Sequence, residues 1–304
     1  GLRKWLASTA TIGSGGSAGA EGPIVTIGAV VGSNIARLLG TGSQHSATLL
    51  GCGAAAGLAS VFNAPIAGIF FVMELILRDF SLKTFTPIVI AAEVSSATTQ
   101  GILGDAALFD VGDSFVRGDL KFNVLQIPTF LILGLVCGLL GSVFVRSLDT
   151  TERLFASSRL PIYVRPMVGG LLLGVLGLGI YWFVSTGNIP KFYGNGYPTI
   201  EALLDPNFYF LTDAHEELHK ATPILLALIG LALVKLIATS ITVGSGGAGG
   251  LFAPSLMIGA ATGGAVGYAV HAIGWFPGTS PAFFALVGMA ALVSATTHAP
   301  LTAI

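Results

Sequence analysis

The stretch GSGGSAGAEGPIVTIGAVVGS, residues 13–33, places one carboxylate, Glu21, between a glycine-rich turn and an apolar segment. The nearest other charged residues are Lys4 and Arg37. Proline is favoured in the first turn of a helix, where its missing N–H costs nothing. Pro23 therefore predicts a helix that begins near Glu21, with a lone acid at its start.

The same pattern occurs a second time in the chain. The stretch GSGGAGGLFAPSLMIGAATGG, residues 244–264, matches the first without a gap at ten positions, each 231 residues after its counterpart. A second pair of apolar stretches follows in the same order and ends in Asn63-Ala64-Pro65 and His298-Ala299-Pro300. Two motifs repeated in order argue against chance similarity. Duplicated membrane proteins often bind their substrate where the halves meet, at glycine- and proline-broken helices, so we expect two such halves.

The composition is that of an integral membrane protein. Hydrophobic residues make up 53% of the 304 residues, charged residues 10%, and the mean hydropathy is +0.83. A soluble domain carries about 25% charged residues, and a membrane span needs about 20 apolar residues. The apolar runs are continuous, so they predict helices and not a barrel. The candidate membrane segments are 24–40, 46–77, 85–103, 123–146, 166–186, 221–243, 251–273 and 282–304.

We expect a single membrane domain over 1–304, with a first-half portion at about 1–103 and a second half at about 123–304. No cytoplasmic regulatory domain is expected in these residues, and the chain resembles a piece of a longer membrane protein. The Lys/Arg distribution puts the connections 78–83 and 146–165 in the cytoplasm. The connections 104–121 and 191–220 would then lie outside.

Other function classes find little support in the sequence. The net charge of −1 argues against a nucleic-acid partner. The cysteines, Cys52 and Cys137, both lie in apolar runs and lack metal-ligand spacing. No nucleophile and base pattern occurs, so neither an enzyme, a metal site nor a cofactor is expected.

The paired helix starts suggest an anion site. A helix start presents free N–H groups and the positive end of its dipole, and two such ends bind an anion without a full positive charge. A buried Lys or Arg would hold an anion too tightly for release. Glu21 could occupy such a site itself, or it could simply cap its helix. The candidate donors are the backbone amides of Ala20, Glu21, Gly22, Gly250, Leu251, Phe252 and Ala253.

These motifs resemble those of the CLC family of chloride channels and chloride/proton antiporters. GAEGP (19–23) resembles the family's G(K/R)EGP motif and GLFAP (250–254) its GxFxP motif. GAAAGLASVFNAPIAGIFFVMEL (53–75) resembles the helix that follows the first motif. The resemblance extends over residues 1–304.

The resemblance implies an inverted repeat of two halves with broken and re-entrant helices. It implies a homodimer in a bacterial-type inner or plasma membrane, each subunit carrying its own chloride pore. Glu21 would be the gate of that pore. The amides of Leu251 and Phe252 would hold the central chloride.

Departures from the family pattern bear on mechanism. Ala20 replaces a basic residue beside the gate. A serine motif expected before residue 1 and a pore tyrosine expected after residue 304 are absent from the chain, which leaves the anion preference open. Proton-coupled members carry Glu-Glu where this chain reads Glu74-Leu75. Leu75 cannot relay protons, which favours a channel or uncoupled conduction. An antiporter is the alternative, and a non-conducting sensor or scaffold a more distant one.

Three further charged residues are secondary candidates. We expect Glu74 to be a structural acid paired with Arg78 at i,i+4. Glu93 is either a substitute proton relay or an acid buried at a helix or dimer contact, beside Ser95, Ser96 or Thr98. Lys235 precedes the second motif, and a structural role with a contribution to the local field is favoured over direct anion binding.

Overall fold

The structure is a computed structural model that describes residues 1–104, 108–109, 124–184, 191–209, 217–275 and 280–303. The predicted all-α class is confirmed. In chain order the elements are α1 (Leu2–Gly13), α2 (Glu21–Leu38), α3 (Ser43–Phe62), α4 (Pro65–Phe71), the π-helix η1 (Val72–Leu77), α5 (Leu82–Leu103), the 3-10 helix η2 (Val124–Gln126), α7 (Ile127–Ser157), α8 (Arg165–Val184), α9 (Tyr197–Leu204), the 3-10 helix η3 (Pro206–Tyr209), α10 (Glu217–Gly244), α11 (Phe252–Ala272) and α12 (Pro281–Thr297).

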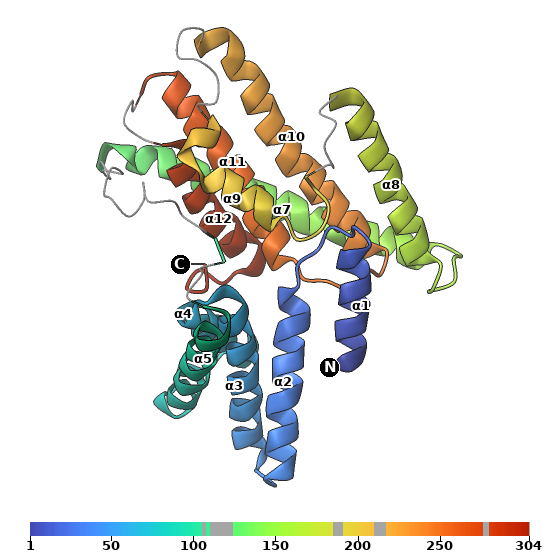
Figure 1. The fold of residues 1–304 in the computed structure, drawn as a ribbon, viewed down its shortest axis with the longest axis vertical. Helices are drawn as coiled ribbons and strands as arrows, with labels where there is room; N and C mark the ends of the chain where they lie inside the picture. The colour runs from blue at the N-terminus through green and yellow to red at the C-terminus, as the bar shows by residue number, and fades with distance from the viewer. Residues whose placement is uncertain (105–107, 110–123, 185–190, 210–216, 276–279, 304) are drawn as a thin grey trace.

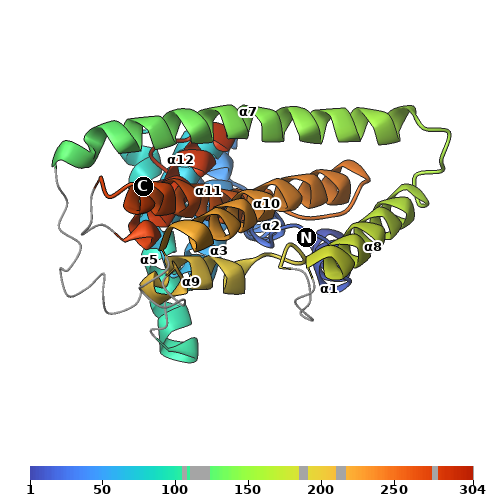
Figure 2. The ribbon, with the colours of Figure 1, turned by 90° about the horizontal axis from the view of Figure 1, so that it is seen from above.

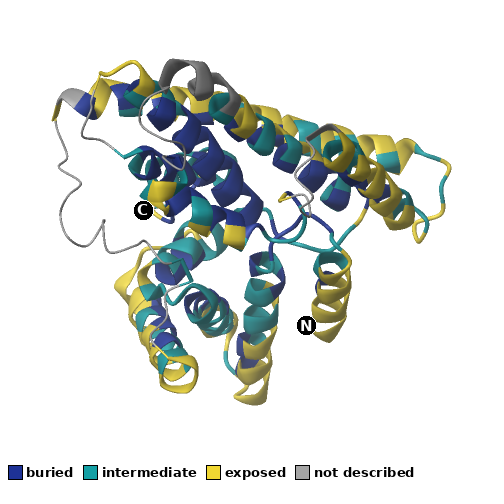
Figure 3. Ribbon diagram, turned by 45° about the horizontal axis from the view of Figure 1, so that its top comes forward, coloured by how far each residue is buried: buried dark blue, intermediate teal, exposed yellow. Residues whose placement is uncertain are grey.

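The chain is a multi-pass membrane protein. Five helical segments of the described residues are long and apolar enough to cross a bilayer: Ser43–Phe62, Ile127–Ser157, Arg165–Trp182, Ile224–Gly244 and Phe252–Ala272. The span in α11 is 83% buried within the chain. A helix that is apolar on all sides belongs in the interior, and Figure 3 shows the buried residues concentrated there, while the outer faces of α2, α5 and α7 are exposed.

The two copies of the repeated motif lie in two groups of helices. Helices α2–α5 lie on one side of the molecule, and α7 and α9–α12 on the other (Figure 1). From the junction, α2 and α11 run in opposite directions. They begin at Glu21 and Phe252, which are 231 residues apart. The helices that follow, α3 and α12, both end at a left-handed residue, Asn63 (φ 50°) and His298 (φ 55°).

Glycines let the paired helices of each half cross at backbone contact. A Cβ on Gly28 of α2 would overlap the carbonyl oxygen of Gly53 on α3, and the reverse holds as well. In the second half, Gly259 of α11 and Gly288 of α12 meet in the same way. Small residues are the usual means of close helix approach in membranes, so the repeated glycines preserve one crossing in both halves.

Two of the predicted membrane segments are shorter or broken in the structure. The segment 46–77 is not one helix. Asn63 adopts the left-handed conformation, which ends α3, and α4 begins at Pro65. A residue before proline avoids the α conformation, and Ala64 has φ −131° and ψ 78°. The segment 282–304 likewise ends as a helix at Thr297, since His298 is left-handed.

Other boundaries also differ from the predictions. The segment 123–146 continues as α7 to Ser157, and Asp149 and Arg153 form an exposed i,i+4 ion pair of 2.8 Å in this extension. This long helix lies along one edge of the second half, and α8 follows after the loop at its C-terminal end (Figure 2). Helices α1 and α9 were not predicted. The predicted sidedness of the connections stays a prediction, and 105–107, 110–123 and 210–216 lie outside the described residues.

Replacing Gly28 by Ala should destabilise the protein. The added methyl would overlap the Gly53 carbonyl, and overpacking of this kind costs about 1–3 kcal/mol. Gly138→Ala on α7 is the control, because its Cβ would meet nothing within 4 Å and Ala is favoured over Gly in a helix by about 0.5–1 kcal/mol. Thermal unfolding in detergent measures both. Equal melting temperatures for the two variants would show that the crossing tolerates a methyl group.

Candidate functional site

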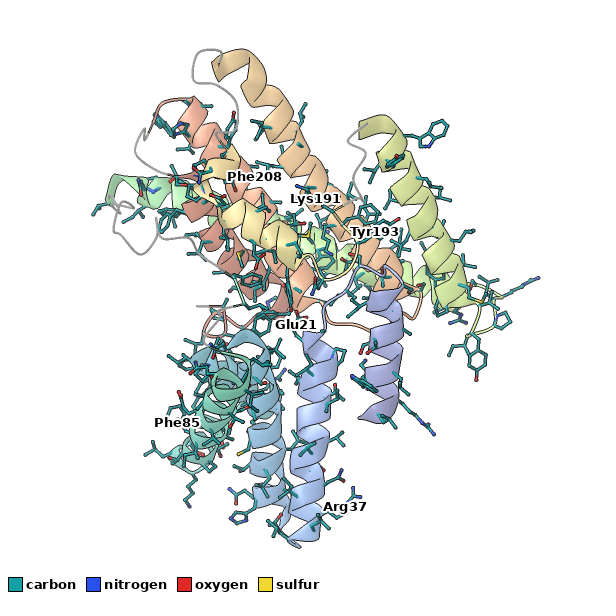
Figure 4. All side chains as sticks on the ribbon, in the orientation of Figure 1. Glu21, Arg37, Phe85, Lys191, Tyr193 and Phe208 are labelled. Carbon is teal, nitrogen blue, oxygen red and sulfur yellow. The ribbon has the colours of Figure 1, made fainter. Side chains whose placement is uncertain are left out.

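The two glycine-rich turns meet at the junction of the halves. Gly19 donates its N–H to the carbonyl of Gly250 at 2.8 Å, and Gly250 donates to the carbonyl of Gly19 at 2.6 Å. This pair of hydrogen bonds is an isolated antiparallel bridge. It holds the starts of α2 and α11 side by side, and Glu21 lies there as the first residue of α2 (Figure 4).

Both helix starts leave amides available at this junction. The residues before the helices are Ala20 for α2 and Leu251 for α11, and neither helix has a side-chain cap bond. The first amides of a helix have no partner within it. Glu21 is the first residue of α2, so a capping role for this acid stays an alternative interpretation.

One of the expected donors is already engaged. The Gly250 N–H donates to Gly19 in the bridge, so it does not point to a ligand in this structure. The sequence could not show this, because the pairing joins two backbones and no side chain encodes it. The candidate donors at the start of α11 are then Leu251, Phe252 and Ala253, opposite Ala20, Glu21 and Gly22 of the first half.

The Glu21 carboxyl is buried between the two halves. The residue is 2% exposed, and its Oε2 makes no hydrogen bond, although the amides of Ala253 and of Glu21 itself lie near the carboxyl. Glycines form the space around it. A Cβ on Gly19 would overlap Oε2, and one on Gly250 would lie 3.2 Å from it. A buried acceptor normally has a hydrogen-bond partner, so the unpaired oxygen makes Glu21 a candidate functional residue.

Tyr197 is the residue at this site that the sequence analysis missed. Its hydroxyl donates to Oε1 of Glu21 across 176 positions of sequence. Tyr197 is the first residue of α9, which lies within the stretch 191–220 that was treated as a connection. The segment GNGYP (194–198) offers glycines and a proline as signals of a turn and a helix start, but no pattern links it to Glu21.

Lys235 of α10 is fully buried and does not reach the surface. Its Nζ donates to the carbonyls of Phe192 at 3.0 Å and Gly194 at 2.8 Å. It also interacts electrostatically with Glu21. The amine thus binds the turn before α9, and the contribution of Lys235 to the field at the site stays a prediction.

The start of α11 is fixed by packing and by its neighbour α12. The Phe252 ring packs edge-to-face on Phe62 with centroids 5.5 Å apart. Ser255 bonds the Leu251 carbonyl at 2.9 Å and lies 3.2 Å from the Thr296 hydroxyl. In the repeat, Phe252 occupies the position of Glu21. The second half thus places an aromatic ring where the first half carries its acid.

Glu74 has a different partner from the one expected. It does not pair with Arg78. It accepts hydrogen bonds from the backbone N–H groups of Leu301 and Thr302 and from the Thr302 hydroxyl, at 3.3, 3.0 and 2.8 Å. The i,i+4 geometry is lost because η1 is π-helical and Arg78 is left-handed. Leu75 lies in the same π-helix and is partly buried.

Glu93 lies apart from the junction. Its side chain is exposed on α5, so the burial that was expected is not formed within the chain. The neighbouring hydroxyls bond elsewhere. Ser95 donates to the Ala56 carbonyl, Ser96 to Asn63 and Thr98 to the Val94 carbonyl.

Comparison with known proteins identifies the family of the chain. The family model for voltage gated chloride channels matches residues 1–304. The chain belongs to the CLC family. It is 34% identical to a ClcB-like chloride channel protein of Ralstonia nicotianae, over 100% of this chain and 65% of that protein. It is 32% identical to the voltage-gated ClC-type chloride channel ClcB of Citrobacter koseri, over 99% of this chain and 65% of that protein.

A solved CLC structure has the same fold. The crystal structure of a slow cyanobacterial Cl−/H+ antiporter matches with a TM-score of 0.74 and 28% identity, covering 96% of this chain and 63% of that one. The chain therefore spans less than two thirds of the length of each of these CLC proteins.

Replacing Lys235 by Met should loosen the turn before α9. Met keeps the length of the side chain but leaves the Phe192 and Gly194 carbonyls unpaired, and an unsatisfied buried group costs about 1–3 kcal/mol. We expect amide hydrogen exchange at 192–197 to rise roughly tenfold or more. Lys191→Met is the control, since that exposed amine lies 5.5 Å from the Phe208 ring. Unchanged exchange in Lys235→Met would show that the amine does not hold the turn.

Proposed function

We propose that the chain forms much of the membrane domain of a CLC-type transport protein that passes chloride, with Glu21 as its gate. The observation that carries the proposal is the buried Glu21 carboxyl, which has one oxygen unpaired between two uncapped helix starts. Membership of the CLC family and the names of its relatives support chloride as the substrate.

The binding energy for the anion would come from dipoles. The amides of Leu251, Phe252 and Ala253 begin α11, and those of Ala20, Glu21 and Gly22 begin α2. Partial positive charge at a helix end attracts an anion. Lys235 adds field from a distance while its amine is bound to carbonyl oxygens. The anion would thus meet no fixed charge to bind it irreversibly, as conduction requires.

Glu21 would work as a gate by competing with the anion. Its carboxylate carries the same charge as chloride and lies beside the same helix starts. Protonation would remove that charge and weaken its hold on the site, and displacement of the side chain would open the path. Flux would then rise as pH falls, because protons remove the competing anion.

The transport mode is proposed to be a channel or uncoupled conduction. Leu75 occupies the position at which proton-coupled relatives carry an acid, and an apolar side chain relays no protons. A chloride/proton antiporter is the alternative, and the similarity to a cyanobacterial Cl−/H+ antiporter favours it.

The proposed setting is a homodimer in a bacterial inner membrane. Bacterial ClcB relatives support the location. The exposed apolar residues Ile90 and Val94 of α5, next to Glu93, are compatible with a contact between two copies.

Removing the Glu21 carboxylate should raise chloride flux and flatten its pH dependence. In the intact protein reconstituted in liposomes, we expect both Glu21→Ala and Glu21→Gln to show this, because neither side chain carries a charge to compete with chloride. Glu201→Gln on α9 is the matched control, since that acid is exposed. Wild-type rate and pH dependence in both Glu21 variants would rule out the gate. Absence of saturable bromide binding by calorimetry would instead favour a sensor or scaffold.

The two transport modes differ in their reversal potential. With chloride and pH gradients imposed together, a channel reverses at the chloride equilibrium potential, and an antiporter shifts with pH. We expect the potential to follow chloride alone, since Leu75 interrupts the proton path. A pH-dependent potential would establish coupling and would require another proton route.

A further inference from the structure

The hydrogen bond between Tyr197 and Glu21 joins the gate to the opposite half of the fold. Glu21 begins α2, in the first half, and Tyr197 begins α9, which packs on α11 and α12 in the second. The tyrosine hydroxyl is the donor, so it favours the carboxylate in its ionised form. Among the described residues, Oε2 has no hydrogen-bond partner. Tyr197 is the described side chain that hydrogen-bonds the carboxyl in its buried position.

Neighbouring residues hold Tyr197 in place at its ring and at its backbone. Its ring packs edge-to-face on Phe109 with centroids 5.5 Å apart. Its N–H donates to the side-chain oxygen of Asn195 at 3.3 Å. The preceding Gly196 is left-handed (φ 87°), and a Cβ there would overlap the Met257 sulfur and lie 3.5 Å from the Lys235 amine. The path of the chain into Tyr197 thus tolerates little variation.

Lys235 fixes the turn from which Tyr197 projects. Its amine donates to the carbonyls of Phe192 and Gly194, five and three residues before the tyrosine. Gly194 is left-handed as well (φ 65°), and Phe192 is buried and stacked on Tyr193 with centroids 4.3 Å apart. Burial of a charged amine is costly unless the amine is hydrogen-bonded. The two hydrogen bonds of Lys235 meet this need and also hold the turn that leads to Tyr197.

We propose that Tyr197 is a positioning residue that latches Glu21 in its closed, buried position, and that Lys235 sets the latch through the turn 192–196. This proposal rests on the proposed function of Glu21 as a gate. Opening would require the carboxylate to give up the tyrosine hydroxyl as well as the helix starts. The groups with charge or a titratable proton that face Glu21 are then Tyr197 from α9 and Lys235 from α10; α11 contributes backbone amides.

Tyr197→Phe should weaken the latch and leave the fold intact. Phe keeps the ring contact with Phe109 and removes the hydroxyl. A hydrogen bond to a charged group changes an equilibrium by roughly tenfold or more, so we expect basal chloride flux to rise severalfold. Without the donor, the carboxylate accepts a proton more readily. The pH of half-maximal flux should therefore move up by about one unit, which corresponds to a tenfold change.

Two controls separate the latch from a general packing effect. Tyr209→Phe removes a hydroxyl that is also buried but bonds the Leu203 carbonyl at 2.8 Å, and it should leave the pH midpoint unchanged. In a Glu21→Ala background, Tyr197→Phe should add nothing, because the hydroxyl has no carboxylate to hold. Infrared spectroscopy gives a second readout without flux: the carboxyl band that Glu21→Gln removes should titrate at higher pH in Tyr197→Phe.

The outcomes distinguish failure of the latch from failure of the gate. A wild-type pH midpoint in Tyr197→Phe, with flux still raised in Glu21→Ala, would overturn the latch and leave the gate standing. An effect of Tyr197→Phe that persists in the Glu21→Ala background would also overturn it. If Glu21→Ala leaves chloride flux and its pH dependence unchanged, the proposed gating role of Glu21 is overturned. The infrared titration then shows separately whether the Tyr197 hydroxyl acts on the Glu21 carboxyl.

Discussion

The reciprocal hydrogen bonds between Gly19 and Gly250 are the constraint on which the site depends. They require two turns, 231 residues apart, to approach until their backbones pair. Side chains would prevent this, since a Cβ on Gly249 would overlap that of Ala18 and one on Gly22 would lie 3.3 Å from the Gly250 Cα. Once the turns are paired, the positions of the two helix starts relative to each other follow.

Most of the polar groups described at this junction are hydrogen-bonded to backbone or to one another, and Oε2 of Glu21 is the exception. The Lys235 amine is bound to carbonyls, the Glu21 carboxyl to a tyrosine hydroxyl, and Ser17 to Thr239 and Thr242. Each of these pairs links segments that lie far apart in sequence. The interior is therefore specified by polar contacts as well as by apolar packing.

Much of the fold follows from local chemistry and from the repeat. Pro23 and Pro254 mark helix starts, and the shared glycines mark crossings, because those residue types act within one turn of where they stand. Asn63-Ala64-Pro65 indicates a helix break, which the prediction of one segment over 46–77 did not take into account. The acid at the site and the amides of Leu251 and Phe252 could likewise be named from the sequence.

The contacts that complete the site could not be predicted. Tyr197 meets Glu21 only because α9 docks on α11 and α12, and no periodicity encodes that docking. Lys235 donates to backbone carbonyls. Every residue has a backbone carbonyl, so the sequence does not indicate which residues are its partners. Glu74 was assigned the wrong partner because an α-helical spacing was assumed for a π-helix.

The exchange of Glu21 for Phe252 between the two copies has a consequence for polarity. Two identical helix starts related by an inverted repeat would give a site with indistinguishable faces. An acid on one start and a phenyl ring on the other break that equivalence while the backbone keeps it. The duplicated scaffold thereby carries a titratable side chain at one of its two equivalent helix starts and an inert ring at the other.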